Sequence, residues 1–117
     1  MKRVPAIFFR TSNGREPVRE WLKSLSSADR RRIGQDIKTV EFGWPVGMPL
    51  CRHLGHQLWE VRTTLTKDGI SRVIFCIYQG QLVLLHGFIK KSQRIPKQEL
   101  DLALQRKRLL EEADEEI

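Results

Sequence analysis

The chain has 117 residues, of which 40% are hydrophobic and 30% are charged. This length and polarity are typical of one domain, spanning residues 1–117, that can bury a core of its own. No apolar run approaches the roughly 20 residues that a membrane helix needs, and the apolar stretch behind the basic N-terminus is too short for a signal peptide. We therefore expect a cytoplasmic protein with no membrane partner.

The positive charge is concentrated before residue 98. Lys and Arg number 21 against 14 Asp and Glu, a formal net charge of +7. Residues 98–117 hold three basic and seven acidic residues, which leaves 18 basic and seven acidic residues in the rest of the chain. A segment with so large an excess of positive charge attracts polyanions such as nucleic acid through counterion release. A solvated basic surface without a partner would have the same composition.

The first half of the chain predicts, in order, a strand over residues 4–9, a helix over 16–25, a helix over 28–42 and a loop over 43–49. The strand is a short apolar run followed by turn residues. Both helices show apolar residues at helical spacing; Pro17 suits the first turn of one, and Ser26 is a candidate cap of the other. The loop is rich in glycine and proline, which do not continue a helix.

The second half predicts strands over residues 58–65, 70–78 and 81–89 and a last helix that begins at Pro96. Tight turns join the three strands into an antiparallel meander. The residues around Gly55 are interpreted as a loop. The predicted order is β-α-α-β-β-β-α, an α+β fold in which the helices cover one face of an antiparallel sheet and the other face stays half open.

Strand alternation groups several charged residues on one face of this sheet. Glu60 and Arg62 lie two residues apart and therefore share a face. If Tyr78 pairs with Gln81, Arg72 lies opposite Gly87 in the next strand. Arg62 lies beside Arg72 only if a five-residue connection, residues 65–69, joins their strands.

The same register predicts which of two neighbouring lysines joins the cluster. Lys91 shares the face of Arg72, whereas His86 and Lys90 point to the opposite face unless the strand end twists. Two arginines and a lysine that converge would repel one another without an anion, and the planar guanidinium suits phosphate oxygens. The alternative is a surface ion-pair network around Glu60, and the sequence does not decide between the two.

RNA cleavage without a metal needs a base for the ribose 2′-OH, positive charge at the phosphate and an acid for the leaving 5′-oxygen. Glu60 is a candidate base, Arg62 and Arg72 are candidate phosphate ligands, and Lys90 or Lys91 can stabilise charge or donate a proton. We expect no metal and no cofactor. We also expect that Arg62→Ala and Arg72→Ala each remove activity without unfolding the domain.

Other polar and aromatic residues carry weaker signals. His86 has a suitable pKa for acid–base work, but a histidine on an apolar strand is more often part of the core. His53 and His56 near Cys51 indicate a zinc site only weakly. Trp44, in the predicted loop, is the one tryptophan that remains a candidate for stacking on RNA bases. The two cysteines, Cys51 and Cys76, are expected to be reduced thiols.

Three segments resemble a known family. Residues 54–62, LGHQLWEVR, resemble the L-G-x-G-L-W-E-L-R segment of the phage-derived, HigB-like branch of the RelE/ParE toxin superfamily. Residues 71–75, SRVIF, are similar to its Y-R-I-L-F strand. Residues 84–96, LLHGFIKKSQRIP, look like its L-L-H-G-F-x-K-K-T-Q-K-T-P run. Gln57 stands where a glycine is usual, and Ile95 where a threonine is usual.

The resemblance implies the toxin of a type II toxin–antitoxin pair, a compact α+β ribonuclease that enters the ribosome and cuts mRNA. It implies a helix-turn-helix antitoxin as partner. The family's functional positions correspond here to Glu60, Arg62, Arg72, Lys90 and Lys91. Of these, all but Glu60 are expected to bind RNA.

Arg94, in the last of the three segments, joins the residues expected to bind RNA. Two other functions remain open from the sequence: a non-enzymatic DNA gyrase inhibitor of the ParE kind, and a nucleic-acid-binding module without toxicity.

Overall fold

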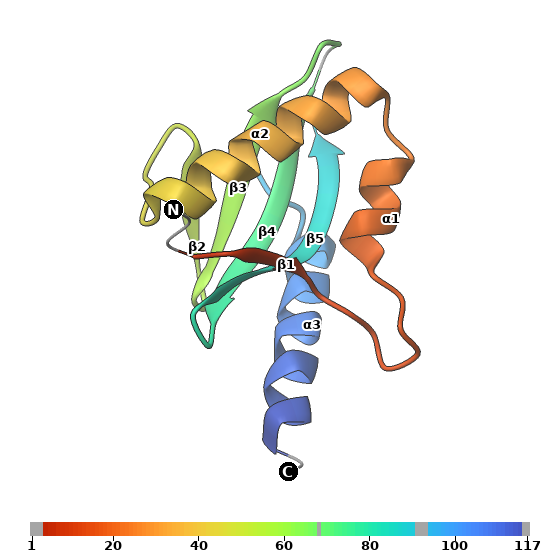
Figure 1. Ribbon diagram of the computed structural model, residues 1–117, viewed down its shortest axis with the longest axis vertical. Helices are drawn as coiled ribbons and strands as arrows, with labels where there is room; N and C mark the ends of the chain where they lie inside the picture. The colour runs from red at the N-terminus through yellow and green to blue at the C-terminus, as the bar shows by residue number, and fades with distance from the viewer. Residues whose placement is uncertain (1–3, 68, 91–93, 116–117) are drawn as a thin grey trace.

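The computed structural model describes residues 4–67, 69–90 and 94–115 (Figure 1). The helices are α1 (Pro17–Lys23), α2 (Ser27–Gly43) and α3 (Lys97–Glu115). The strands are β1 (Ala6–Phe8), β2 (Cys51–Gly55), β3 (Leu58–Thr64), β4 (Ile70–Tyr78) and β5 (Gln81–Lys90). None of the helices in these ranges has the length and apolar character that a membrane crossing requires.

The expected helices and strands are present, and the α+β class is confirmed. The N-cap of α2 is Ser26, whose hydroxyl accepts a hydrogen bond from the Asp29 N–H at 3.2 Å. The buried side of α2 consists of the four residues predicted from helical spacing, which are Ile33, Ile37, Val40 and Glu41. Local sequence signals therefore determine these elements.

The loop expected around Gly55 is instead the strand β2, and this corrects the predicted element order. A two-residue turn of His56 and Gln57 connects β2 to β3, and both residues adopt positive φ angles of 54° and 59°. Glycine, asparagine or aspartate usually occupies such positions, because other side chains are strained there. The hairpin therefore lacks the sequence signal by which it would be recognised.

The five strands form one sheet in the order β1-β5-β4-β3-β2. The meander β2 to β5 is antiparallel as expected, but β1 pairs parallel with β5, with Ala6 opposite Leu82. The sheet is therefore mixed and not purely antiparallel. Residues at the far end of the chain supply the partner of β1, so no local pattern indicates its direction.

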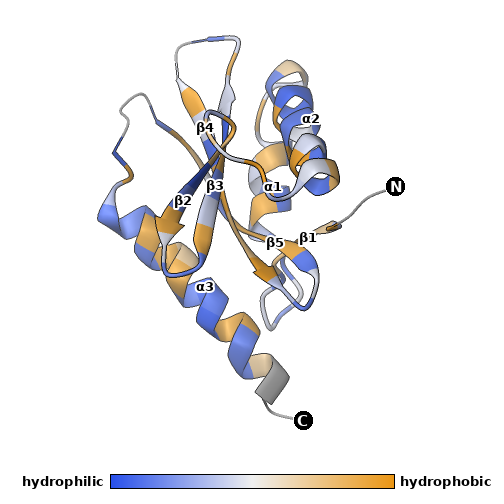
Figure 2. Cartoon of the chain, turned by 90° about the vertical axis from the view of Figure 1, so that its left-hand side faces the viewer, coloured by the Kyte–Doolittle hydropathy of each residue, from blue (hydrophilic) through white to orange (hydrophobic). Residues whose placement is uncertain are grey.

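Helices cover both faces of the sheet, which corrects the expectation that they lie on one side. Figure 2 shows α1 and α2 on one side of the strands and α3 on the other. The buried side chains form two clusters accordingly, one around α1 and α2 that includes Val18, Ile33 and Phe75, and one around Ala103 of α3 that includes Ile74 and Leu85. Residues 71–76 of β4 are all buried, as in a strand that is covered on both faces.

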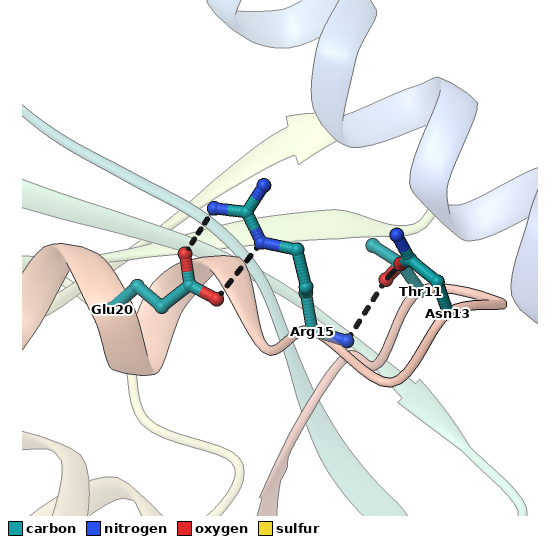
Figure 3. Close-up of polar contacts among 4 residues, drawn as sticks. All are labelled: Thr11, Asn13, Arg15 and Glu20. Atoms are coloured by element: carbon teal, nitrogen blue, oxygen red, sulfur yellow. Dashed lines mark hydrogen bonds and ion pairs between the residues drawn. The ribbon is translucent and has the colours of Figure 1, made fainter.

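The connection from β1 to α1 is held by polar contacts (Figure 3). The Thr11 hydroxyl donates to Asn13 Oδ1 and accepts from the Arg15 N–H at 3.0 Å. The Arg15 guanidinium then reaches α1, where it donates to both carboxylate oxygens of Glu20 at 2.6 and 3.2 Å. The hydrogen bond from Arg15 holds the pKa of Glu20 below its usual value. These contacts direct the chain from the sheet edge into α1.

Both cysteines are free thiols inside the fold, as expected from the sequence. Burial raises the pKa of Cys51 from 9.0 to about 11, assisted by the negative charges of Asp36 and Glu60. Burial also raises the pKa of Cys76 to about 11, against the opposing charge of Lys107. Only the thiolate is strongly nucleophilic, so both residues are poorly reactive in the native protein.

We expect native protein at pH 7.5 to react with iodoacetamide roughly a hundredfold more slowly than the unfolded chain, because two pKa units remove that share of thiolate. Since the folded-state pKa lies above the unfolded one, the thiol contribution to stability is present below pH 9 and is lost as the pH rises towards 11. Mass spectrometry of alkylated protein, with and without urea, measures this. Rapid native alkylation of either cysteine would contradict its burial.

Candidate functional site

Charged residues of three strands meet on the face of the sheet that α3 covers in part. Arg62 of β3 lies directly opposite Arg72 of β4, and residues 65–69 connect their strands. The five-residue connection on which the meeting of Arg62 and Arg72 depended is therefore present, an arrangement that the sequence permitted but did not demand. On the other side of β3, Glu60 lies opposite Arg52 of β2. Directly opposed residues share a face, so the four side chains form one cluster.

Glu60 is at the centre of this cluster. Its Oε1 lies 2.8 Å from Arg72 Nη1, 3.9 Å from Arg52 Nη1 and 4.0 Å from Arg62 Nε. One carboxylate therefore faces three guanidinium groups, and the cluster keeps a surplus of positive charge. An anion on the solvent side would be attracted to that surplus.

The pair at the base of the cluster is buried. The side chains of Glu60 and Arg72 are both 0% exposed, and Arg72 Nη1 donates a charge-assisted hydrogen bond to Glu60. The sequence left open an ion-pair network around Glu60 on the protein surface. Such a network is present, but its central pair lies inside the protein. Neither side chain touches solvent in this conformation, so neither reaches a substrate without a movement. Removing Arg72 would leave a buried carboxylate unpaired, so Arg72→Ala is not the clean probe that the sequence suggested.

Arg62 and Arg52 form the solvent side of the cluster, with side chains 13% and 42% exposed. They border a hollow of about 620 Å³ beside the N-terminal end of α3, which is lined by Met48, Arg52, His53, Leu54, Arg62, Arg94, Ile95 and Leu100. Arg94, expected to bind RNA, therefore shares a hollow with Arg62. Among the described residues Arg62 Nε has no hydrogen-bond partner.

Arg52 is the residue that the sequence reasoning missed. The residues around Gly55 were interpreted as a loop, and Arg52 was not considered for the cluster. The sequence of β2 shows no alternation, because its apolar residues Cys51 and Leu54 are three positions apart and pack on opposite faces of the sheet; only the pairing with β3 places Arg52 beside Glu60. Three guanidinium groups, and not two, therefore surround the carboxylate.

A β-bulge changes the predicted register at the other side of the cluster. Ile74 pairs with His86 and Phe75 with Leu84, so β5 contains one extra residue, Leu85. Arg72 consequently lies opposite Phe88 and not Gly87. The turn at residues 79–80 has the expected pairing, and no turn or glycine signal marks the shift further along the hairpin.

The bulge exchanges the faces predicted for residues 86–90 of β5, so His86 lies on the face of Arg72 and not on the opposite one. Lys90 lies opposite Ile70 and shares the face of Arg72, which corrects its predicted orientation, and Lys91 lies outside the described residues. Gly87 instead faces the α1 side, where a Cβ would lie 2.4 Å from the Trp21 ring. Gly87 therefore makes room for the Trp21 ring, and it does not separate the basic residues on the other face.

His86 links β5 to α3. Its Nε2 lies 2.8 Å from Glu99 Oε2, and its Nδ1 lies 3.4 Å from Arg106 Nη1, which donates to the Leu85 carbonyl at 2.8 Å. Burial lowers the pKa of Arg106. The imidazole also stacks on Phe88, with ring centroids 5.6 Å apart. These contacts agree with the interpretation of His86 as a histidine engaged in packing.

Trp44, considered as a base-stacking residue, and His53, considered as a zinc ligand, both pack against other aromatic rings. Trp44 makes T-shaped contacts with Trp59 and Phe75, at 5.1 and 5.3 Å between ring centroids, so this partly buried side chain packs against the core cluster. His53 packs against Trp59 at 5.0 Å. Within the described ranges, no three His, Cys, Asp or Glu side chains are grouped so that they would hold a metal ion.

Comparison with known proteins gives one match. The model of the family described as "Phage derived protein Gp49-like (DUF891)" matches residues 20–108, which include all of α1 except its first turn, the whole meander and the first half of α3. None of the curated proteins compared with the chain matches it. The matched range contains every residue of the arginine cluster.

Proposed function

The chain belongs to the family of phage-derived Gp49-like proteins, which is associated with RelE-like toxins, and from this we propose that it is a toxin that cuts mRNA on the ribosome. The fold is compatible with that of RelE. We further assign the chain to the HigB-like branch, on the strength of residues 84–96, and propose a helix-turn-helix antitoxin as its partner. Its place of action is then the cytoplasm.

The observation that carries the proposal is the arginine cluster. The buried carboxylate of Glu60 is hydrogen-bonded to Arg72 at the base of the cluster. It also lies 3.9 and 4.0 Å from Arg52 and Arg62, which line a hollow together with Arg94. Positive groups fixed in advance stabilise a transition state better than groups that must reorganise. Such an arrangement suits a phosphate group whose negative charge increases during the reaction.

The proposed reaction is metal-independent and proceeds through the ribose. The 2′-oxygen passes its proton to a solvent water molecule and attacks the adjacent phosphorus, and the bond from phosphorus to the 5′-oxygen breaks as that oxygen takes up a proton. The products are a 2′,3′-cyclic phosphate and a 5′-hydroxyl end. Arg62 and Arg94 stabilise the phosphate. Lys90, which lies opposite Ile70 on the same face as Arg72, supplies charge or a proton. We place Glu60 as the positioning residue of the arginines.

The ribosome compensates for the weakness of this acid–base machinery. Lysine and arginine have ordinary pKa values of about 10 and above, so they exchange protons poorly at neutral pH. Acid–base catalysis contributes about 10²–10⁴-fold, and holding the 2′-oxygen in line with the phosphate can contribute more. A ribosome holds its A-site codon in place, which free RNA does not do for itself.

We therefore expect efficient cleavage of a message on ribosomes stalled with a vacant A site and little or no cleavage of the same message alone. Mapping 5′ ends, with and without kinase treatment to detect 5′-hydroxyls, measures this. Equal cleavage in both samples would refute ribosome dependence but leave the ribonuclease assignment standing. No cleavage in either, with DNA damage on expression, would instead support a gyrase inhibitor.

A further inference from the structure

A second hollow lies across Arg62 from the first. It has a volume of about 440 Å³ and is lined by Arg32, Gln35, Asp36, Pro49, Leu50, Arg62, Thr63, Thr64 and Ile70. The lining comes from one side of α2, from the segment that enters β2 and from the end of β3. Arg62 is a lining residue of both hollows, so the two hollows adjoin at this position of β3.

The second hollow has the charge and the hydrogen-bonding groups of an anion site. Arg32 of α2 and Arg62 of β3 are the two basic residues of its lining. The one carboxylate in the lining, Asp36, already accepts a hydrogen bond from the Thr63 hydroxyl at 2.7 Å. Gln35 and Thr64 are exposed and supply further polar groups suited to a sugar or phosphate oxygen. The balance of the hollow is therefore positive.

We propose that this second hollow binds the ribose-phosphate backbone of RNA next to the phosphate that is cut, with Arg32 as its phosphate ligand. The inference rests on the proposed function. A strand whose reactive phosphate lies at Arg62 continues in both directions, and only a flanking contact fixes the angle at which it crosses. Arg32 thereby acts in binding and positioning, away from the reacting bonds.

The chain offers a matched control for Arg32. Arg31 is its neighbour on α2, is equally exposed and has the same charge, but lines neither hollow. Arg32→Ala and Arg31→Ala therefore change the net charge and the helix propensity alike. Any difference between them reports on the hollow and not on the general attraction of a basic protein for RNA.

The test is fluorescence anisotropy of a labelled single-stranded RNA hexanucleotide with the full-length chain, titrated at several salt concentrations. We expect Arg32→Ala to weaken binding about five- to tenfold, as for loss of one charge-assisted contact, and to reduce the salt slope by about 0.7, the value of one phosphate on a single strand. Arg31→Ala should change binding by no more than about twofold, in line with an exposed charge. Arg32→Lys should keep most of the affinity.

The outcomes separate this inference from the proposed function. If the wild-type chain binds RNA but Arg32→Ala and Arg31→Ala behave alike, the second site is refuted and the nuclease proposal is untouched. If the wild-type chain neither binds the hexanucleotide nor cuts mRNA on the ribosome, both are refuted. Circular dichroism of each variant confirms that an exposed substitution has left the fold unchanged.

Discussion

Replacing Arg62 with alanine is expected to reduce mRNA cleavage on the ribosome by about a hundredfold or more while the protein stays folded. Arg62 contributes to both hollows and lies 4.0 Å from Glu60, too far for a strong ion pair. Its charge is thus available to a phosphate, and loss of one preorganised charge-stabilising group costs on the order of 10²-fold in rate. Stability should fall by only about 1 kcal/mol.

The measurement is the rate of appearance of 5′ ends on ribosome-bound message at equal concentrations of variant and wild type. Arg19→Ala is the control, because Arg19 lies on α1, has an exposed side chain that pairs with Glu16 at 3.3 Å, and borders neither hollow. A cleavage rate for Arg62→Ala within a few-fold of wild type would remove this residue from the site.

Replacing Arg72 with alanine is expected to destabilise the fold by roughly 3–5 kcal/mol, the range for breaking a buried ion pair from one side. Glu60 would keep a carboxylate that is 0% exposed and would lose its 2.8 Å partner. Arg52 and Arg62, at 3.9 and 4.0 Å, are not close enough to replace that bond without moving. Urea unfolding followed by circular dichroism gives the change in free energy.

A double variant distinguishes the pair's structural role from any other effect of Arg72→Ala. In Glu60→Leu/Arg72→Met both charges are replaced by apolar side chains of similar length, which is often neutral or even stabilising in a buried position. We expect this variant to recover most of the lost stability and to remain inactive, because the cluster that orients Arg62 is gone. A single Arg72→Ala variant that unfolds at the wild-type urea concentration would show that the pair contributes little.

The sequence predicted those parts of the fold that depend on neighbouring residues. Helical spacing identified the buried side of α2, and the turn at residues 79–80 set the start of the β4–β5 hairpin. Strand alternation placed Glu60 and Arg62 together, and Arg62 meets Arg72 through the five-residue connection that this pairing requires. These features follow from periods of two and 3.6 residues, which the sequence carries directly.

The features that were wrong depend on residues that meet only in the folded chain. The apolar side of α3 fits either face of a sheet whose central strand β4 is buried on both sides, so helical periodicity alone does not choose between them. The extra residue Leu85 is visible only from its pairing with β4. The burial of Glu60, at 0% exposure, also depends on this long-range packing, and it is the reason why we propose a positioning role for a residue that the sequence made a candidate base.

The two edge strands, β1 and β2, have a consequence for aggregation of the protein. Unpaired strand edges are templates on which other chains add, and long, flat, uncharged edges are the most hazardous. Here β1 offers only three residues, and β2 offers five, carries Arg52 and shifts register between His53 and Gly55. A sheet with one deeply apolar strand, β4, thus ends on both sides in strands too short or too irregular to seed intermolecular fibrils.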